Sequence, residues 1–468
     1  MQKMIAKFAL LFLLMVMAES VYSQHSYEEV EMEEEPDKKL FGKLLKTGSF
    51  EFHLRSYMMG TVNQGALTNY STWGTGAGVG YFSPRWKGLG VGFSGFFVFR
   101  HFENHITELD PLTGMPNRYE LPLYDVHHPE NHKDMDRLEE FYISYESSSI
   151  SAWFGRHHFE SPLLNASDNR MRPNLFSGLS LDWNKSDFTV QGAWFTHVIS
   201  RGSLEWLPID ESFGFYPTGR NPTGEEESYQ HHIHTKGIGV LGLGWDNEQV
   251  TAKSWSYLSE GVFATNLSQV EGRKPMVKGP DLVWGVQTMF QAAIGDGGNP
   301  DPAKAYILPG EKSSAFGMRA GLSWPHSKWT VNYLGFSDRG RFLFPREWGR
   351  EQFFASLPRE RFEGLGATHA IMTQFEQQLA DDRMKVVLGV SHVKTPDIHH
   401  VELNKYGIPS YLHFSGLADY RFKGFFHGLD LQLLVVAKKE LFEREIPLEY
   451  VINRVEMMNF NLILDYRF

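Results

Sequence analysis

The stretch NFNLILDYRF, Asn459–Phe468, ends the chain and is the clearest indicator of its fold. Large apolar residues occupy every second position (Phe460, Leu462, Leu464, Tyr466 and Phe468), and Asn461, Ile463, Asp465 and Arg467 lie between them. This alternation with a period of two predicts a β-strand. The apolar face would be core in a soluble protein, whereas in an outer-membrane barrel it would meet lipid and the polar face a wet lumen. One strand is compatible with both, so the rest of the chain must decide.

The N-terminus indicates export, which leaves a periplasmic, a secreted and an outer-membrane location open. The chain has 468 residues, a net charge of −11 and no cysteine, which excludes disulfides, thiolate metal sites and a cysteine nucleophile. Lys3 and Lys7 precede an apolar run at residues 8–18, and Val21-Tyr22-Ser23 resembles a cleavage site. The run is shorter than the ~20 residues of a membrane span. Residues 1–23 are therefore interpreted as a secretory signal peptide.

The mature chain is predicted to begin with a flexible acidic leader, residues 24–46, followed by a barrel, residues 47–468. Alternation recurs throughout this barrel region, for example from Phe50 to Arg55, from Leu89 to Arg100 and from Phe316 to Trp324. We place eighteen strands, an even number, which begin near residues 48, 72, 89, 137, 149, 176, 187, 236, 249, 262, 281, 313, 328, 366, 383, 411, 428 and 457.

The connections between these strands alternate in length. Short turns are expected at 83–88, 147–149, 184–187, 246–248, 325–328 and 380–383. Long polar segments are expected at about 101–136, 158–175, 199–235, 292–312, 337–363 and 394–410. Five tryptophans lie beside the short turns and suit an interfacial girdle: Trp86, Trp183, Trp245, Trp324 and Trp329. Short periplasmic turns and long external loops are typical of an all-β, antiparallel transmembrane barrel in the bacterial outer membrane.

Three stretches resemble the OprD family of outer-membrane porins. They are GRHHFESPLLNASDNRMRPNLFSG (155–178), FPREWGREQFFASLPRERFEG (344–364), and the end of the chain from 411–434 to 462–468. The resemblance covers nearly the whole mature chain, and its first stretch is the most specific. It implies an eighteen-stranded monomeric barrel and passive uptake of small carboxylate-bearing or amino-acid-like solutes. The acidic leader and histidine-rich loops depart from the family pattern, so the solute stays open.

Arginines are the candidate substrate-binding residues of such a pore. Arg55, Arg100 and Arg319 fall on the polar parity of their strands and are expected to face the lumen. Arg156 shares the parity of Ala152 and Phe154, and only the resemblance places it inward. The two long loops contribute the other candidates: Arg170, Arg172, Arg341, Arg346, Arg350, Arg359 and Arg361.

These guanidinium groups suit a basic track, because they keep their charge and bind carboxylates bidentately. A row of weak sites would let an anion move from one arginine to the next. Under the alternative interpretation, the arginines pair with nearby carboxylates and hold the loops in place. Those carboxylates are Glu51, Asp168, Glu347, Glu351, Glu360 and Glu363.

Other functions are less well supported by the sequence. No nucleophile elbow, P-loop or nucleic-acid-binding pattern occurs. His231, His232 and His234 could bind a metal, but a polar surface loop is the preferred interpretation. We therefore expect no enzyme activity, cofactor or metal. The expected partners are the lipid bilayer, small solutes and the outer-membrane assembly machinery, which would recognise the terminal Phe468. Two alternatives stay open: a barrel-embedded hydrolase, and a closed barrel that binds partners through its loops.

Overall fold

The computed structural model describes residues 48–167, 170–441 and 446–468. The predicted signal peptide and acidic leader lie outside these residues. The helices in the described ranges are three single turns, Leu121–Leu123, Gly424–Phe426 and Leu448–Tyr450. No helix in the described part of the chain is long and apolar enough to cross a membrane. The architecture is therefore carried by β-strands.

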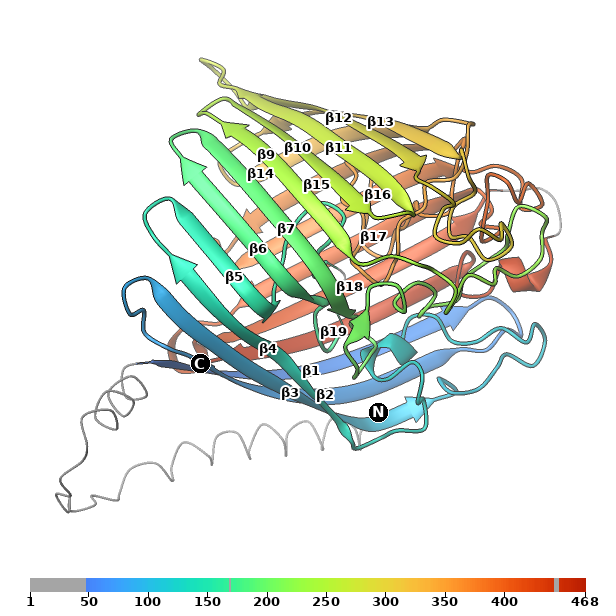
Figure 1. Cartoon of the computed structure of the whole chain (residues 1–468), viewed down its shortest axis with the longest axis horizontal. Helices are drawn as coiled ribbons and strands as arrows, with labels where there is room; N and C mark the ends of the chain where they lie inside the picture. Colours follow the sequence, from blue (N-terminus) through green and yellow to red (C-terminus); the bar gives the residue numbers. More distant parts are fainter. Residues whose placement is uncertain (1–47, 168–169, 442–445) are drawn as a thin grey trace. The chain divides into compact units, whose positions relative to one another are not determined.

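The strands form one antiparallel sheet (Figure 1). Their bounds are β1 (Ser49–Asn63), β2 (Tyr70–Phe82), β3 (Leu89–Asn104), β4 (Met135–Glu146), β5 (Ile150–His157), β6 (Leu175–Lys185), β7 (Phe188–Ile199), β8 (Leu207–Pro208), β9 (Ile238–Asp246), β10 (Val250–Ser259), β11 (Phe263–Lys274), β12 (Asp281–Ala293), β13 (Lys312–Ser323), β14 (Ser327–Phe336), β15 (His369–Leu379), β16 (Met384–Lys394), β17 (Tyr411–Arg421), β18 (Leu429–Glu440) and β19 (Met457–Arg467).

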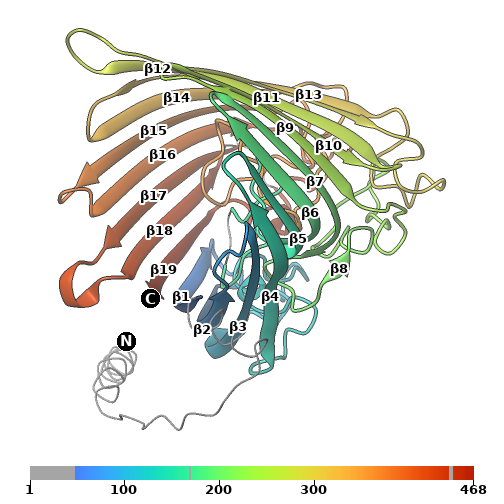
Figure 2. The same ribbon diagram turned by 60° about the vertical axis from the view of Figure 1, so that its left-hand side comes forward.

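The sheet closes on itself as a barrel (Figure 2). Each long strand pairs with its neighbours in the chain, and β1 pairs with β19 from His53↔Arg467 to Asn63↔Met457. Within the described residues, eighteen strands make the wall, while the two-residue β8 only adds to the edge of β7. The predicted barrel and its strand count are thus confirmed. The largest error in a strand start is at β15, predicted near 366 and found at His369.

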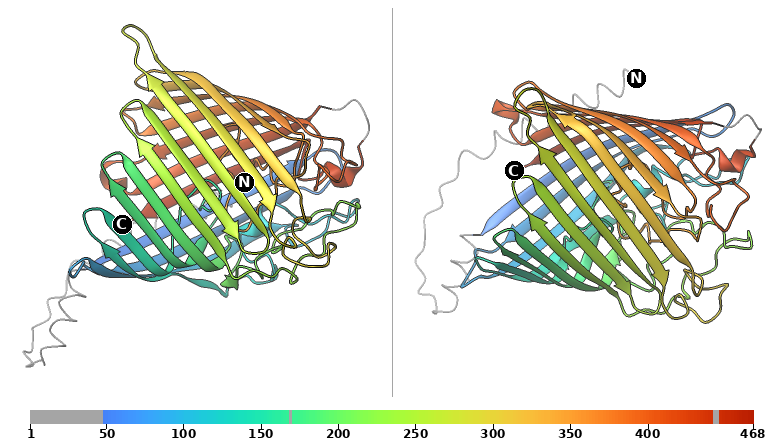
Figure 3. Two further views of the ribbon diagram at one scale, coloured as in Figure 1. Left: turned by 45° about the horizontal axis from the view of Figure 1, so that its top comes forward. Right: turned by 90° about the horizontal axis from the view of Figure 1, so that it is seen from above.

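Connections of unequal length leave the two ends of the barrel different (Figure 3). At the turn end, strands are joined by short segments such as 147–149 and 247–249. At the loop end lie segments such as 105–134, 158–174, 200–237, 337–368 and 395–410. The predicted asymmetry is confirmed, and the connection between β18 and β19 is a further long one that the sequence did not indicate. The weakest strand pair, β10 and β11, is also present, joined at residues 260–262.

The two faces of each strand differ as the alternation predicts. Phe50 and Phe468 are 57% and 61% exposed on the outer face, whereas Asn461 on the inner face is 1% exposed. The residue after an inward one points outward because successive side chains of a strand alternate between faces. The barrel therefore presents an apolar exterior, and its inner face carries buried polar side chains such as Asn461 together with buried apolar ones such as Met289.

A row of glycines opens space along the inner wall of β2. Gly76 and Gly78 pair with inward residues of β1 and β3, and a Cβ on Gly76 would lie 2.2 Å from the ring of Phe96. The same Cβ would lie 3.2 Å from Met171, which belongs to the 158–174 loop. The glycines thus let inward side chains and an inserted loop pack closely against the wall.

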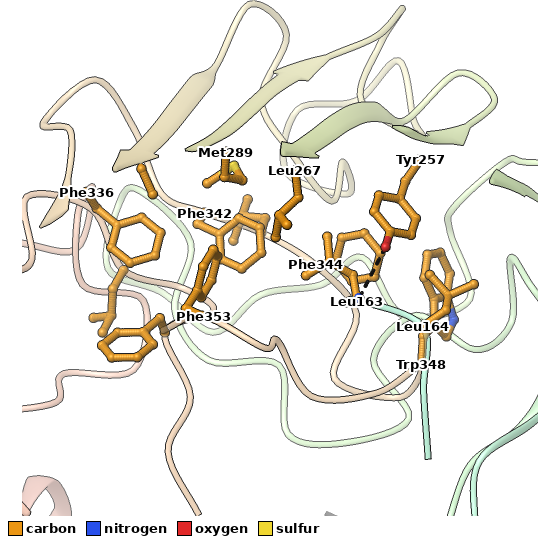
Figure 4. Packing of buried hydrophobic residues seen from close by; sticks show 14 of the residues in the cluster. Leu163, Leu164, Tyr257, Leu267, Met289, Phe336, Phe342, Phe344, Trp348 and Phe353 are labelled. Carbon is orange, nitrogen blue, oxygen red and sulfur yellow. Dashed lines mark hydrogen bonds between the residues drawn. The ribbon is translucent and has the colours of Figure 1, made fainter. Parts of the chain in front are cut away.

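The largest buried hydrophobic cluster joins the wall to these inserted loops (Figure 4). Inward side chains from the wall include Tyr257, Leu267 and Met289. Apolar residues of the loops pack against them: Leu163, Leu164, Phe342, Phe344, Trp348 and Phe353. The phenol of Tyr257 accepts a hydrogen bond from the Leu163 backbone N–H at 3.3 Å. The loop-end half of the lumen is therefore packed with side chains and is narrower than the barrel wall alone would make it.

Candidate functional site in the lumen

The 337–368 loop crosses the inside of the barrel. Near its middle, the Phe354 N–H donates to Gln287 Oε1 of β12 at 3.2 Å. Further along, Arg359 donates to Tyr57 of β1 at 2.8 Å and to Asn461 of β19 at 2.7 Å. The loop therefore spans from one part of the wall to another and occupies part of the lumen.

The 158–174 loop also folds inward, and it contacts the 337–368 loop directly. The Asn165 N–H donates to the Trp348 carbonyl at 3.1 Å, and its Nδ2 donates to the Arg350 carbonyl at 3.0 Å. The Gln352 N–H donates to the Pro162 carbonyl at 3.1 Å. The two loops with the most predicted site residues thus meet inside the lumen, which the sequence could not establish.

Glu360 anchors the 337–368 loop to the wall through a buried group of polar side chains. Its Oε1 lies 3.1 Å from Lys438 Nζ and accepts a hydrogen bond from the Tyr411 hydroxyl. Its Oε2 lies 2.5 Å from His413 Nδ1. Burial alone would raise the pKa of the Glu360 carboxyl, but Lys438 and His413 outweigh it and hold that pKa well below its usual range. Glu360 is therefore a charged anchor.

The three wall arginines predicted to face the lumen all do so, but each has protein partners. Arg55 binds both carboxylate oxygens of Asp465 at 2.8 and 2.9 Å, and donates to the Arg170 carbonyl at 2.7 Å. Arg100 Nη1 lies 2.9 Å from Glu103. Arg319 Nη1 lies 3.2 Å from Glu271. Arg319 is partly buried, whereas Arg55 and Arg100 are buried. These contacts fix the wall and the loops.

The arginines of the 158–174 loop are buried between loops. Arg170 Nε donates to the Tyr119 carbonyl at 3.3 Å. Arg172 is fully buried, and its Nη2 donates to the Tyr124 carbonyl at 3.0 Å. Burial and the nearby charge of Arg137 lower the pKa of Arg172 to about 9. Both side chains therefore join this loop to the 105–134 loop.

The five arginines predicted in the 337–368 loop differ in exposure. Arg341 and Arg359 are buried, whereas Arg346, Arg350 and Arg361 are partly exposed. Ion pairs of 3.5 Å join Arg346 to Glu363 and Arg361 to Glu351. Arg341 lies 3.6 Å from both Glu227 and Glu311, and Arg350 donates to the Leu357 carbonyl at 2.9 Å. Several of these contacts match the alternative in which arginines hold the loops. Asp168, named in that alternative, lies outside the described residues.

Arg156 does not face the lumen, and its inward placement is wrong. In the register of β5, Arg156 pairs with Phe141 and Ser177, while Gly155 and His157 occupy the inner face. Phe141 is 63% exposed on the outer surface. The Arg156 guanidinium lies 4.9 Å from the ring centre of Trp206. Arg156 shares the outer face with Phe154, two residues away in the same strand, because side chains alternate between the faces of a strand whatever their charge.

Four arginines converge at the loop end, and three of them, Arg118, Arg220 and Arg454, were not predicted as site residues. Arg118, Arg220, Arg346 and Arg454 come from four different loops. Burial and then the positive charges of Arg118, Arg220 and Arg346 lower the pKa of Arg454 to about 9. All four side chains are partly exposed. No local sequence signal indicates this convergence, because the rings that Arg220 and Arg346 contact, those of Tyr450 and Tyr406, lie far away in the chain.

Tyrosine rings flank this arginine cluster. Arg346 lies 4.5 Å from the ring centre of Tyr406, and Arg220 and Arg454 lie 5.2 and 5.6 Å from that of Tyr450. Among the described residues, no carboxylate forms an ion pair with Arg118 or Arg454, and Arg454 Nη1 has no hydrogen-bond partner there. Converging like charges disfavour one another. The arrangement is thus suited to an incoming anion.

The histidine-rich segment forms no metal-binding arrangement in the residues that the structure describes, where no group of three histidine or carboxylate side chains comes together. His231 Nδ1 instead lies 2.6 Å from Glu211 Oε2 at the surface. These side chains are placed as parts of a polar loop.

The closed barrel, its unequal ends and its inserted loops define the fold of an outer-membrane porin. Known structures of OprD/Occ porins share this fold. The resemblance in the three sequence stretches is therefore confirmed at the level of the fold. No protein-family model matches the sequence, and no curated protein matches it.

Three of the similar structures illustrate the relationship. The Pseudomonas aeruginosa OpdK structure with vanillate has a TM-score of 0.67 and 11% identity, covering 91% of this chain and 99% of that one. P. aeruginosa OccK9 (OpdG) has a TM-score of 0.69 and 12% identity, covering 91% of this chain and 99% of that one. Acinetobacter baumannii OccAB1 has a TM-score of 0.67 and 11% identity, covering 91% of this chain and 97% of that one.

Proposed function

We propose that the protein is a porin of the bacterial outer membrane that passes small carboxylate-bearing or amino-acid-like solutes by selective, passive diffusion. The observation that carries this proposal is the convergence of Arg118, Arg220, Arg346 and Arg454 at the loop end. Of these four, Arg118 and Arg454 form no ion pair with a carboxylate among the described residues, whereas Arg346 pairs with Glu363. The Arg118 and Arg454 guanidinium groups are therefore available to a solute carboxylate, which they would bind by charge-assisted hydrogen bonds. The vanillate in the OpdK structure is itself a carboxylate.

The inserted loops support selectivity by size. An eighteen-stranded barrel is wide enough for a water-filled channel when nothing fills it. Here the 158–174 and 337–368 loops occupy part of the lumen and are fixed to its wall and to each other. A solute attracted by the arginine cluster would then pass a narrow, polar constriction, where affinity is spread over several weak sites.

The test is single-channel recording in planar bilayers with the refolded mature protein. The double variant Arg118→Gln/Arg454→Gln should shift the reversal potential toward cation preference. It should also raise the concentration of a small carboxylate needed for half-block by about tenfold or more, since each lost charge-assisted bond contributes about 1.5–3 kcal/mol. Basic amino acids serve as the comparison solutes.

Arg156→Gln is the matched control, because this arginine lies on the outer face and should leave ion selectivity unchanged. Unaltered selectivity and block in the double variant would contradict the proposal. A silent bilayer from folded protein would instead favour the closed-barrel alternative, for which the packed loops in the lumen are the supporting observation.

A further inference from the structure

The outer face of β14–β19 carries an apolar groove of about 650 Å³. These strands lie side by side along one wall of the barrel (Figure 2). Large side chains line the groove: Trp329, Phe375, Leu388, Val390, Phe414 and Met458. Gly416 and Ala437 keep it open between them, and a Cβ on Gly416 would find its nearest neighbour, Leu388, at 3.6 Å.

A row that contains two basic side chains, with a leucine between them, lies at the loop end of this groove. In the register, His392, Leu412 and Lys439 form one row across β16, β17 and β18. Val390, Phe414 and Ala437 of the groove form the same-face row that lies two residues closer to the turn end. Two residues along a strand correspond to about 6.6 Å. The basic row and the groove are therefore contiguous.

These cations are not used by the protein itself. His392, Lys394 and Lys439 are exposed, and Lys394 pairs in register with His369 of β15, whose Nδ1 lies 2.8 Å from the Tyr333 hydroxyl. Across the ranges that the structure covers, no ion pair or side-chain hydrogen bond is formed by His392, Lys394 or Lys439. Contacts within the fold therefore do not explain why these three basic residues lie beside an apolar outer surface.

We propose that this face binds an anionic membrane lipid, with its phosphate-bearing headgroup on Lys394, Lys439 and His392 and an acyl chain in the groove. Basic side chains at the boundary of a membrane attract anionic headgroups, and an acyl chain buries its methylene groups in apolar surroundings. The inference rests on the membrane-spanning part of the proposed function and is independent of conduction.

The test is native mass spectrometry of the full mature protein, refolded in detergent micelles and titrated with diphosphorylated lipid A. Lys394→Gln/Lys439→Gln should weaken binding by about tenfold or more, because two of the attracting charges are lost. Gly416→Phe should weaken it by filling the groove. The matched control Lys274→Gln/Lys278→Gln, which removes two exposed charges at the turn end, should bind as the unaltered protein does.

Lipid binding that both charge variants retain equally would overturn the proposal. So would displacement of the lipid by the same excess of inorganic phosphate, which would reduce the site to a simple anion site. Heat-shifted mobility on gels verifies folding, and Ala437→Leu replaces Gly416→Phe if that variant fails to fold. Channel currents recorded from the same preparations separate this outcome from the porin proposal, since the lipid variants should conduct normally.

Discussion

At the scale of single residues, two buried glutamates in the inserted loops have opposite electrostatic roles. Glu360 is held charged by Lys438 and His413, which lower its pKa despite burial. Burial raises the pKa of Glu120, although Thr61 and Asn117 donate hydrogen bonds to it at 2.5 and 2.7 Å. The difference arises because Glu360 has the cation Lys438 as a direct partner, whereas the hydrogen-bond donors to Glu120 are neutral.

We expect Glu360→Gln to destabilise the folded barrel by about 3–5 kcal/mol at neutral pH, because it leaves Lys438 buried without its counter-charge. Glu360 contributes fully to the free energy of unfolding at pH values above its unfolded-state pKa. This contribution is lost as the pH falls through its lowered folded-state pKa. Urea unfolding in lipid vesicles, followed by tryptophan fluorescence, measures the loss.

Glu120→Gln is the comparison variant, and it should be neutral or stabilising at neutral pH. The pKa of Glu120 is higher in the folded than in the unfolded protein. The free energy of unfolding therefore falls as the pH rises from the unfolded-state pKa to the folded-state pKa. An amide does not ionise and can still bond Thr61 and Asn117. Equal destabilisation by the two variants would show that their different partners do not matter.

At the scale of elements, the decisive feature is a joint between two loops. Asn165 bonds the carbonyls of Trp348, Arg350 and Ser161, and its own Oδ1 accepts the N–H groups of Arg350 and Ser167 at 3.1 and 3.0 Å. The Asn165 side chain therefore adds two bonds to Arg350 to the backbone bonds that already join the 158–174 and 337–368 loops.

Asn165→Ala should loosen this joint while leaving the wall intact. Each buried polar group left without a partner costs about 1–3 kcal/mol, so the loops should open locally. We expect larger and noisier single-channel currents and faster hydrogen exchange in both loops. Asn247→Ala, which removes a similar cap from a turn-end connection, should change neither. Quiet, unchanged currents in Asn165→Ala would place the constriction elsewhere.

At the scale of the whole molecule, the last residue completes the barrel. Phe468 exchanges two backbone hydrogen bonds with Phe52 at 2.9 and 3.1 Å, and their rings stack with centres 5.0 Å apart. The contact joins the first and the last strand regions of the described chain. It can form only when β1 and β19 meet, so it reports on closure.

Phe468→Ala should therefore impair closure more than the rest of the fold. The stacked ring pair contributes about 0.5–1.5 kcal/mol beyond its buried area. Slower refolding into lipid vesicles and a lower yield of the heat-shifted, folded form are expected. Phe425→Ala removes an exposed ring from the β17–β18 turn and should refold normally. Refolding of Phe468→Ala at the rate of Phe425→Ala would exclude a role for the terminal ring in closure.

The strands were predictable because the two faces of a strand follow from backbone geometry alone. Alternation at Phe50–Arg55 and Phe460–Phe468 therefore specified which side chains meet the exterior, and the lengths of the connections specified the two ends of the barrel. The interfacial tryptophan girdle stays a prediction; of its five residues, Trp86, Trp324 and Trp329 are exposed at the turn end, and Trp183 and Trp245 are partly exposed. Arg156 shows the limit of resemblance, since its own parity already indicated the outer face.

The sequence by itself determined the barrel, its strand count and the inward orientation of Arg55, Arg100 and Arg319, because each depends on residues near one another in the chain. Only the tertiary structure decided which arginines have carboxylate partners and which loops fill the lumen. Arg359 meets Asn461, and Arg118, Arg220, Arg346 and Arg454 converge from four loops. Such contacts depend on the paths of irregular loops across a closed wall, and no local periodicity encodes them.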